Sequence, residues 1–570
     1  MNVAVTAPKA AAEPQAPTDR LPRSRSPGHA APAGRARLLI PAALLIGVLL
    51  RLAQYAVNRS LWMDEALLAS NFLDGPWSRL LETFERGQTA PLGFLALVKG
   101  AAALLGRAEL ALRLPTLVAG LATLAFLPRV ARRYTTRRAL PFAVATVALA
   151  PYLVYYSSEV KPYAFDALCS VAVLALAHDA ARRPHGRRLA AAFALAGAVA
   201  VWLSQPAVFM LAGTGTVLGA RALRRRDLSA LRLLAPVALA WAASFAGSYA
   251  VARHQLGDAA YMKAFWRTGF APLPPRAAGD WLWLPRMLAR VFREPMGVVG
   301  HDTSALSAVA TAAALLLFAA GAAWMARHRR LRLALLLAPA GAALLASAAH
   351  VYPFGAELST GGRVLVFLLP SLALVMAEGV AAAPRLIPGS AGRAALAAAA
   401  ALALLPGGAY AALSVPHLRA EVKPLLEYVN EQRRPGDLMY VYYNGQPVFE
   451  YYAPRYGWNR SNTVAGACAR MEPGRYVDDL ARLRGRPRVW LLFVEGTPVQ
   501  GFDEQPFMLA YLDHAGRRLD DRVSVGAAVY LYDLRETNLR PEPFRAALPR
   551  LRPDPAQECR GAWQPLNQLR

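Results

Sequence analysis

Two adjacent carboxylates, Asp64 and Glu65, follow an apolar segment that is long enough to cross a bilayer. Ionisable groups near hydrocarbon are costly to bury and usually have a function. A carboxylate can take the proton of an attacking hydroxyl, and a carboxylate pair can hold Mg²⁺ or Mn²⁺. The stretch "MDEALLAS" also fits the start of a short helix, where acids in the first turn suit the helix dipole. Both interpretations stay open from this stretch alone.

A third acid, Glu159, lies in "YYSSEVKPYAF" at the end of another apolar segment, two residues before Lys161 and four before Tyr163. Acidic sites on two elements could flank one reaction centre if both elements end on the same side of a membrane. The simpler interpretation is a solvated loop acid that pairs with Lys161.

Cations accompany these acids at the ends of later segments. Arg363 begins the apolar stretch "RVLVFLLP", and Lys263 and Arg267 lie in a loop that is rich in aromatic residues. A guanidinium can bind a phosphate through two parallel hydrogen bonds, and aromatic rings beside cations suit a sugar or a lipid headgroup. An arginine at a helix end also extends to headgroups without any further role, and aromatic belts are usual at membrane interfaces.

Long apolar helices must position these residues. The chain has 570 residues, of which 55% are hydrophobic, and the apolar residues come in long blocks. A helix needs roughly 17–25 residues to cross about 30 Å of hydrocarbon, so the blocks predict a polytopic α-helical membrane protein. The blocks are 37–57, 91–106, 112–128, 139–156, 163–179, 189–203, 206–222, 232–251, 303–326, 332–350, 363–382 and 393–413.

The net charge of +27 resides largely in arginine-rich loops between the blocks, such as "RVARRYTTRR", "ARRPHGRR" and "RALRRRDLSALR". No nucleic-acid-binding motif accompanies this charge, so we expect no nucleic-acid partner. Lys and Arg in alternate short loops are typical of cytoplasmic loops. All these loops lie inside if 91–106, which is short, begins at Pro91 and carries Lys99, is a juxtamembrane helix on the outer face. About eleven spans then remain, and Asp64, Glu159 and Arg363 share the outer face, with Trp62 as an interfacial anchor.

Three regions follow from this topology. We expect residues 1–36 to form a disordered cytoplasmic tail. Residues 37–413 should form the membrane domain, with its first outer loop at 58–111, and residues 414–570 should form an extracytoplasmic α/β domain. In the last region "LMYVYY" and "VWLLFV" predict buried strands, "EVKPLLEYVNEQ" and "QPVFEYYAPRY" helices, and "RRLDDRVSVGAAVYLYDL" a hairpin. Outside the cytoplasm Cys468 and Cys559 could pair, whereas Cys169 lies in an apolar block.

"LWMDEALLAS", "GQTAPLGFLALVKGAAALLGRAELALRLPTLVAGL" and "YYSSEVKPYAF" together resemble a known family, the GT-C fold glycosyltransferases of the protein O-mannosyltransferase and aminoarabinose transferase type. The resemblance covers about residues 38–180 and is looser through "HVYPFGAELSTGGRVLVFLLP". The order of motifs carries it: an acid pair in the first outer loop, a Pro-Leu juxtamembrane helix, an Arg-Leu-Pro span start, and an acid before Pro-Tyr. Two positions depart from the family pattern: Ala90 replaces the first Pro after Gln88, and Lys161 replaces an Arg.

The resemblance implies a bacterial inner-membrane enzyme that moves a sugar from a polyprenyl-phosphate donor to a glycolipid, polysaccharide or protein acceptor, with inversion. It implies that Asp64 is central to catalysis, as general base. We expect Glu65 to orient Asp64, bind the acceptor or hold a metal, and Glu159 to position the donor sugar or a divalent ion shared with Asp64.

The expected substrate ligands are Lys161 and Arg363 for the phosphate, together with Tyr163, Gln88 and Lys263.

Two other classes of function are alternatives. A lipid or sugar transporter usually shows internal repeats and ionisable groups near the membrane midplane, and Asp166 is the one residue here that fits. A non-catalytic membrane anchor for the C-terminal region would leave the three acids without a role.

Overall fold

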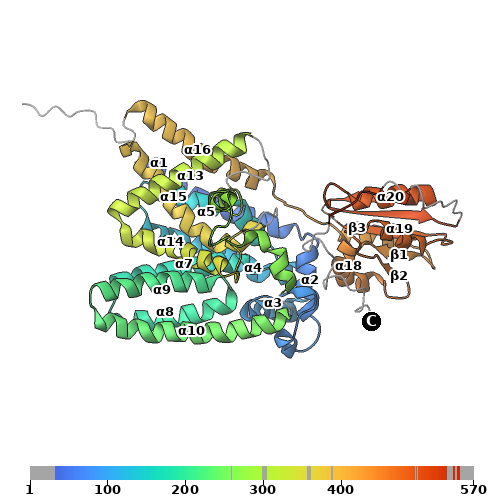
Figure 1. The fold of residues 1–570 in the computed structure, drawn as a ribbon, viewed down its shortest axis with the longest axis horizontal. Coiled ribbons are helices and arrows are strands. Elements are labelled where there is room, and N and C mark those ends of the chain that lie inside the picture. Colours follow the sequence, from blue (N-terminus) through green and yellow to red (C-terminus); the bar gives the residue numbers. More distant parts are fainter. Residues whose placement is uncertain are drawn as a thin grey trace, which may run out of the picture.

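The computed structural model describes residues 33–257, 260–297, 305–355, 361–386, 389–494, 496, 498–535, 544–545 and 548–552. Long helices form one body, and a small mixed sheet with its own helices lies at one end of them, beside α2 (Figure 1). The predicted fold class, a polytopic helical protein with a C-terminal α/β region, is confirmed. The proposed tail at 1–36 falls almost entirely outside the described residues.

The helices of the membrane region cover the apolar blocks, and α2, α11 and α12 lie between the blocks. They are α1 (Ala33–Ala56), α2 (Met63–Phe72), α3 (Leu92–Leu105), α4 (Glu109–Tyr134), α5 (Leu140–Ala148), α6 (Pro151–Tyr156), α7 (Tyr163–Arg182), α8 (Arg187–Leu203), α9 (Ala207–Arg224), α10 (Leu228–Leu256), α11 (Ala260–Phe265), α12 (Trp283–Arg293), α13 (Ala305–His328), α14 (Arg330–Ala348), α15 (Leu369–Leu386) and α16 (Ser390–Leu413).

Within the described residues, eight helical segments are long and apolar enough to span a membrane. The segment α3 is shorter, as expected of a juxtamembrane helix, and α8 has only 17 residues. The count of about eleven spans therefore stays a prediction.

Two expected continuous segments are interrupted, and proline explains the first break. Block 139–156 is divided into α5 and α6 because Pro151 has no N–H to donate and Ala150, before it, takes an extended conformation. The turn at 157–162 therefore follows directly after the short, separate helix α6. Block 363–382 begins as the 3₁₀ helix Gly361–Leu368 and continues as α15.

Close helix contacts hold the body together. At the crossing of α13 and α15, a Cβ on Gly321 would lie 2.0 Å from the Val375 carbonyl oxygen, and one on Gly379 would lie 1.8 Å from that of Leu317. Only glycine permits this approach, which is a common way for apolar helices to pack where the surrounding solvent is itself apolar.

The C-terminal region has a five-stranded sheet in the order β2-β1-β3-β5-β4. β1 (Leu438–Val441) pairs in parallel with β2 (Thr463–Ala465) and β3 (Val489–Val494), and β4 (Arg517–Ser524) forms the predicted hairpin with β5 (Ala527–Asp533). Its helices are α17 (Lys423–Gln432), α18 (Gln446–Tyr452), α19 (Gly474–Ala481) and α20 (Glu504–Ala515). Every residue of β3 is buried, as its continuous apolar run predicts.

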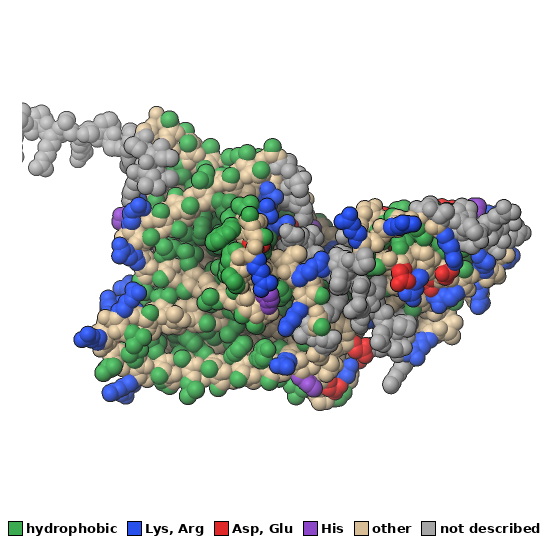
Figure 2. All heavy atoms as spheres, in the orientation of Figure 1, with side chains coloured by type: hydrophobic (Ala, Val, Ile, Leu, Met, Phe, Trp, Pro, Cys, Tyr) green, Lys and Arg blue, Asp and Glu red, His purple; other side chains and the backbone are tan. Residues whose placement is uncertain are grey.

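The arginine-rich loops lie at the opposite end. Exposed arginines occur in the α7–α8 and α9–α10 loops, such as Arg183 and Arg225, and at the start of α8, where Arg187 lies. Lys and Arg side chains gather at the end of the helical body that lies away from the strands (Figure 2).

Candidate active site

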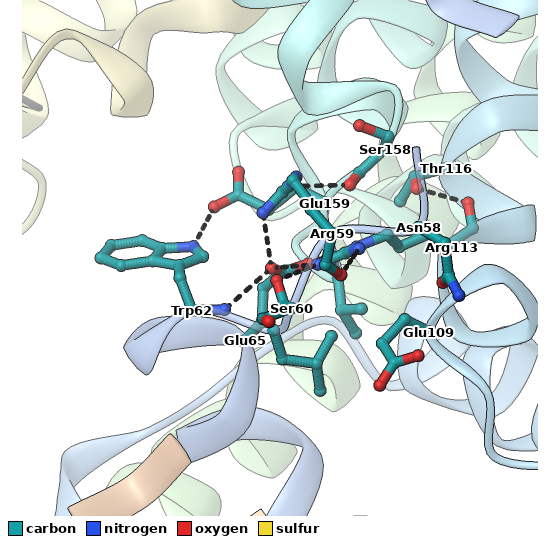
Figure 3. Close-up of polar contacts among 12 residues, drawn as sticks. Asn58, Arg59, Ser60, Trp62, Glu65, Glu109, Arg113, Thr116, Ser158 and Glu159 are labelled. Atoms are coloured by element: carbon teal, nitrogen blue, oxygen red, sulfur yellow. Dashed lines mark hydrogen bonds and ion pairs between the residues drawn. The ribbon is translucent and has the colours of Figure 1, made fainter. Parts of the chain in front are cut away.

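Two loops, one before α2 and one between α6 and α7, meet at the carboxylate of Glu65, which is fully buried. Its Oε2 accepts hydrogen bonds from Arg59 Nη1 at 3.0 Å and Arg113 Nη2 at 2.7 Å. Its Oε1 accepts from Arg113 Nε at 2.9 Å and from the Val160 backbone N–H at 2.8 Å. We call these residues, with Trp62, the Glu65 cluster (Figure 3). It joins the loop before α2 to the loop between α6 and α7.

The same carboxylate caps α2. Trp62 takes an extended conformation before the helix, and its backbone N–H donates to Glu65 Oε2 at 3.3 Å. An acid at the third helical position that reaches back in this way is the acidic half of a capping box. Burial alone would raise the pKa of Glu65, but Arg113 and Arg59 outweigh it and lower the pKa to about 2. Glu65 is therefore a permanently charged structural group.

Asp64, its neighbour, faces a different environment. Its side chain is 17% exposed, and its Oδ2 accepts one ion-paired hydrogen bond, from Arg363 Nη1 at 2.8 Å. The Arg363 guanidinium also lies 5.7 Å from the centre of the Trp266 ring. Burial raises the pKa of Asp64, but Arg363 and Lys161 more than offset it, so the carboxyl is ionised at neutral pH.

Glu159 lies on the second loop, between α6 and α7. Its Oε1 accepts from the Trp62 indole Nε1 at 2.6 Å (Figure 3), while its buried Oε2 has no hydrogen-bond partner among the described residues. Burial, and then the charge of Glu65, raise its pKa. Two carboxyls whose environments move their pKa values apart are typical of sites where one acid is a base and the other carries a proton.

Lys161 completes the edge of the site. Its Nζ donates to Gln88 Oε1 at 3.1 Å, which links the start of α7 to the loop before α3. Burial lowers the pKa of this amine, and Asp64 opposes the shift. Tyr163, the first residue of α7, packs its ring 4.6 Å from that of Tyr156.

The structure thus brings most of the predicted site residues into one place on the side of the helices that faces the C-terminal sheet. We call Asp64, Glu159, Lys161 and Arg363 the Asp64 edge. Lys263 differs: it is exposed on α11 and forms no described hydrogen bond or ion pair with the acids of the edge. The roles of all these residues stay predictions.

Sequence reasoning missed the partners of Glu65 and misplaced Trp62. Arg59 and Arg113 are 2% exposed or less, yet nothing in their local sequence marks them as buried ligands of an acid. The Arg-Leu-Pro start of α4 was the one available signal. Trp62 is only 7% exposed and binds Glu159, so the expectation of an interfacial anchor is wrong. Its indole N–H donates to the buried Glu159 carboxyl, whereas an indole at a membrane interface would donate to water or headgroups.

The expected divalent-ion site does not fit this geometry. Asp64 is already bound to a guanidinium and Glu159 to an indole N–H, and both face further cations. In the part of the chain that the structure describes, no three His, Cys, Asp or Glu residues come together in a group that could hold a metal. Oxygen-rich sites for Mg²⁺ or Mn²⁺ usually provide more free carboxylate oxygens than this.

Comparisons with known proteins agree with the motifs. Residues 89–247 match the model of the family described as dolichyl-phosphate-mannose-protein mannosyltransferase. A search of curated protein sequences gives no significant match.

Solved structures show a distant likeness. The crystal structure of ArnT from Cupriavidus metallidurans bound to undecaprenyl phosphate is 14% identical, with a TM-score of 0.49, 88% of this chain covered and 98% of that one. The oligosaccharyltransferase AglB from Archaeoglobus fulgidus, in complex with an inhibitory peptide and a dolichol-phosphate, is 13% identical, with a TM-score of 0.46 and coverage of 87% and 74%. Because both scores lie below 0.5, the assignment rests on the family match. That match confirms the resemblance predicted from the sequence, and with it that the chain is a membrane-embedded glycosyltransferase.

Proposed function

We propose that the chain transfers a sugar from a polyprenyl-phosphate donor to a hydroxyl group of an envelope glycolipid, polysaccharide or protein, on the outer face of the plasma membrane. The observation that carries this proposal is the Asp64 edge. Among the described residues, the ionised Asp64 accepts one side-chain hydrogen bond, and it lies beside the buried Lys161 and the partly buried Arg363, at the ends of membrane helices. A base and phosphate-binding cations are the two parts that this reaction needs.

The reaction follows from this arrangement. Asp64 takes the proton of the acceptor hydroxyl while the hydroxyl oxygen attacks the anomeric carbon. The bond from that carbon to the phosphate oxygen breaks, and the polyprenyl phosphate leaves with the electron pair. A single displacement of this kind inverts the anomeric centre. Lys161 and Arg363 stabilise the charge that develops on the leaving phosphate.

The donor would also tune the base. Without it, Arg363 and Lys161 hold the pKa of Asp64 below its ordinary value, which makes Asp64 a weak base. A bound phosphate would give Arg363 a second acceptor and offset the cationic field. Asp64 would then become more basic when the donor is in place.

Two features support the outer location. The exposed arginines lie at the end of the helices away from the sheet, as cytoplasmic loops do under the positive-inside rule (Figure 2). Cys468 forms a disulfide bond, which is typical of an oxidising compartment. Its expected partner, Cys559, lies outside the described residues.

The test is a transfer assay with purified protein, membrane extract as acceptor and labelled polyprenyl-phosphate sugars. Wild type should transfer label, and Asp64→Asn should lose about 10²–10⁴-fold, the usual contribution of a general base. Asp74→Asn is the matched control, because Asp74 is 76% exposed in the same outer loop and its described ion pair is with the exposed Arg107. Equal transfer by wild type and Asp64→Asn would refute the base assignment.

The transporter alternative has its own readout. The protein is reconstituted into vesicles that contain labelled donor lipid and no acceptor. Movement of the label across the bilayer without any transfer in the first assay would replace our proposal by that alternative.

A further inference from the structure

The C-terminal sheet has a cavity at the edge where the parallel strands β1 and β3 end. Its volume is about 280 Å³, close to the lower end of the range of about 300–1,000 Å³ that small-molecule sites have. The chain leaves β1 toward β2 on one side, and it leaves β3 toward β4 and β5 on the other. In open α/β sheets, ligands bind at the carboxyl ends of neighbouring strands whose connections diverge in this way. The cavity lies at that position.

Three segments meet at this edge and form the wall of the cavity: the end of β1, the start of α20, and β5 with the turn before it. Because the first residue of β5 pairs with the last residue of β3, the β4–β5 turn lies at the same edge. The described lining includes Tyr442, Asp503, Glu504, Ser524, Gly526 and Tyr530. It contains two carboxylates and, among the described residues, no Lys, Arg or His.

Glu504 is the buried acid of this wall, with 3% of the residue exposed. Its Oε2 accepts hydrogen bonds from the hydroxyls of Tyr442 and Tyr443. Its Oε1 has no hydrogen-bond partner among the described residues and lies 3.7 Å from Nε of Arg470, which does not line the cavity. A buried carboxylate oxygen without a hydrogen bond is costly, so a ligand that donates one would be favoured.

Further acceptors lie nearer to the solvent. Asp503 is exposed, and its Oδ1 caps α20 by accepting from the Gln505 N–H at 3.3 Å, while its Oδ2 forms no described hydrogen bond. The Ser524 hydroxyl forms none either. Tyr442 and Tyr530 add aromatic rings to the wall. A sugar ring suits such a wall, because its hydroxyls donate to carboxylates and its C–H groups pack against aromatic rings.

The β4–β5 turn joins this wall to the linker that runs from α16 to α17. Gly526 has φ +64°, and a Cβ there would lie 1.8 Å from the Arg419 carbonyl oxygen in the linker. The guanidinium carbon of Arg419 lies 3.4 Å from the centre of the Trp62 ring, and the Trp62 indole N–H donates to Glu159. One chain of contacts therefore connects the cavity wall with the Asp64 edge.

We propose that this cavity binds a sugar unit of the acceptor, one without acidic groups, away from the hydroxyl that reacts at the Asp64 edge. The described lining offers acceptors for hydroxyl groups and no cation, so it disfavours phosphate and carboxylate groups. This proposal rests on the proposed function. It makes the acceptor a glycan, whether a lipid, a polysaccharide or a protein carries it, and it gives the C-terminal region the task of recognising that glycan.

The test measures binding of oligosaccharides to the full-length protein in detergent by calorimetry. The probes are neutral tetrasaccharides of glucose, mannose, galactose and N-acetylglucosamine, and tetragalacturonate is their acidic counterpart. Wild type should bind at least one neutral probe. Glu504→Gln keeps the shape of the side chain and an oxygen for the tyrosine hydroxyls, and it should bind that probe about 10- to 100-fold more weakly, the effect of losing hydrogen bonds to a charged acceptor.

Two variants at the rim keep the test independent of the buried acid. Asp503→Asn preserves the helix cap, and Ser524→Ala removes a hydroxyl that has no described hydrogen bond, so both proteins should unfold as wild type does. Each should weaken binding several-fold. Asp521→Asn is the matched control, because Asp521 is exposed on β4 and does not line the cavity. It should bind with the affinity of wild type.

Three results would overturn the proposal. The first is a wild type that binds no neutral probe, the second is equal affinities of wild type and both rim variants, and the third is tighter binding of tetragalacturonate than of every neutral probe. A wild type that transfers label but binds no probe would refute the sugar site alone. A wild type that binds a probe but transfers nothing would refute the proposed function.

The transfer assay identifies the carrier of the glycan. It is run separately with the glycolipid, polysaccharide and protein fractions of the membrane extract, in the presence and absence of the probe that binds. Inhibition of transfer to one fraction assigns the acceptor to it, and the rim variants should raise KM for that fraction and leave kcat unchanged. Undiminished transfer to all three fractions at saturating probe would show that the cavity does not hold the acceptor.

Discussion

The Glu65 cluster and the Asp64 edge contain neighbouring acids of the same helix turn, yet they are built for different tasks. Glu65 is fully buried and accepts five hydrogen bonds, four of them from two arginines and a backbone N–H of the facing loop. Asp64 is partly exposed and accepts one described side-chain bond. A carboxylate whose lone pairs are all occupied holds structure together, whereas one with free lone pairs can take a proton.

The cations differ in the same way. Arg113 grips Glu65 with two nitrogens and also donates to the Arg59 and Ser60 carbonyls, at 2.7 and 3.0 Å. Arg363 gives Asp64 a single nitrogen and has an Nε atom without a hydrogen-bond partner among the described residues. Arg113 is committed to the fold, and Arg363 retains donors for a ligand.

The largest effect that separates the two regions is on stability. Glu65→Ala should lower the free energy of unfolding by about 3–5 kcal/mol, because it leaves Arg59 and Arg113 buried without their counter-charge. Asp64→Asn should change it by less than about 1 kcal/mol, since this site is partly exposed. Thermal unfolding in detergent, followed by tryptophan fluorescence, measures both. Equal losses of unfolding free energy in the two variants would show that Glu65 is not the structural acid and Asp64 the available one.

A smaller effect tests the geometry of the Arg113 fork. Arg113→Lys keeps the charge and loses the bidentate contact, which should reduce the free energy of unfolding by about 1–3 kcal/mol. Arg107→Lys is the control, because Arg107 forms an exposed ion pair with Asp74 and such pairs contribute at most about 1 kcal/mol. If Arg113→Lys were as stable as its control, the positive charge at position 113, and not the bidentate contact, would account for the stability that the Glu65 cluster provides.

At the Asp64 edge the cations should affect the donor rather than the fold. Arg363→Lys should raise the KM for the polyprenyl-phosphate sugar about tenfold, the usual effect of one lost charge-assisted hydrogen bond. Lys263→Ala should leave KM close to that of wild type, because Lys263 is exposed and forms no described hydrogen bond or ion pair with the acids. A larger KM change for Lys263→Ala than for Arg363→Lys would restore Lys263 as a donor ligand and weaken the role of Arg363.

The smallest effect depends on pH and concerns Glu159. The pKa of Glu159 is raised in the folded protein above its ordinary 4.5, so its ionisation opposes folding. The stability that the protonated form provides is present below the unfolded pKa and is lost as the pH rises through the folded pKa. Glu159→Gln keeps an oxygen for Trp62 and removes the ionisation, so it should raise the melting temperature at pH 7 and not below pH 4.5. A variant that is less stable than wild type at pH 7 would contradict this prediction.

Much of this architecture can be predicted from local sequence. Every apolar block became helical, because runs of Ala, Leu and Val fit only helices in an apolar solvent. Strands β1 and β3 and the β4–β5 hairpin follow from short β-rich runs bounded by turns. The break at Pro151 could also have been predicted, since proline is common at the first position of a helix. We expected one continuous helix over 139–156 because an average hydropathy over the block does not register a single proline.

The sequence by itself determined which residues carry chemistry: acids and cations at the ends of apolar blocks are rare enough to be noticed one at a time. Only the tertiary structure decided which of these acids and cations bind each other in the fold and which keep atoms free for a ligand. Asp64 and Glu65 are adjacent in the chain, but helix geometry points them in different directions, so they meet different partners. Two of those partners are distant in the sequence: Arg113 lies 48 positions from Glu65, and Arg363 lies 299 positions from Asp64. No local pattern records such distant contacts, because they depend on how the loops and the C-terminal region pack together.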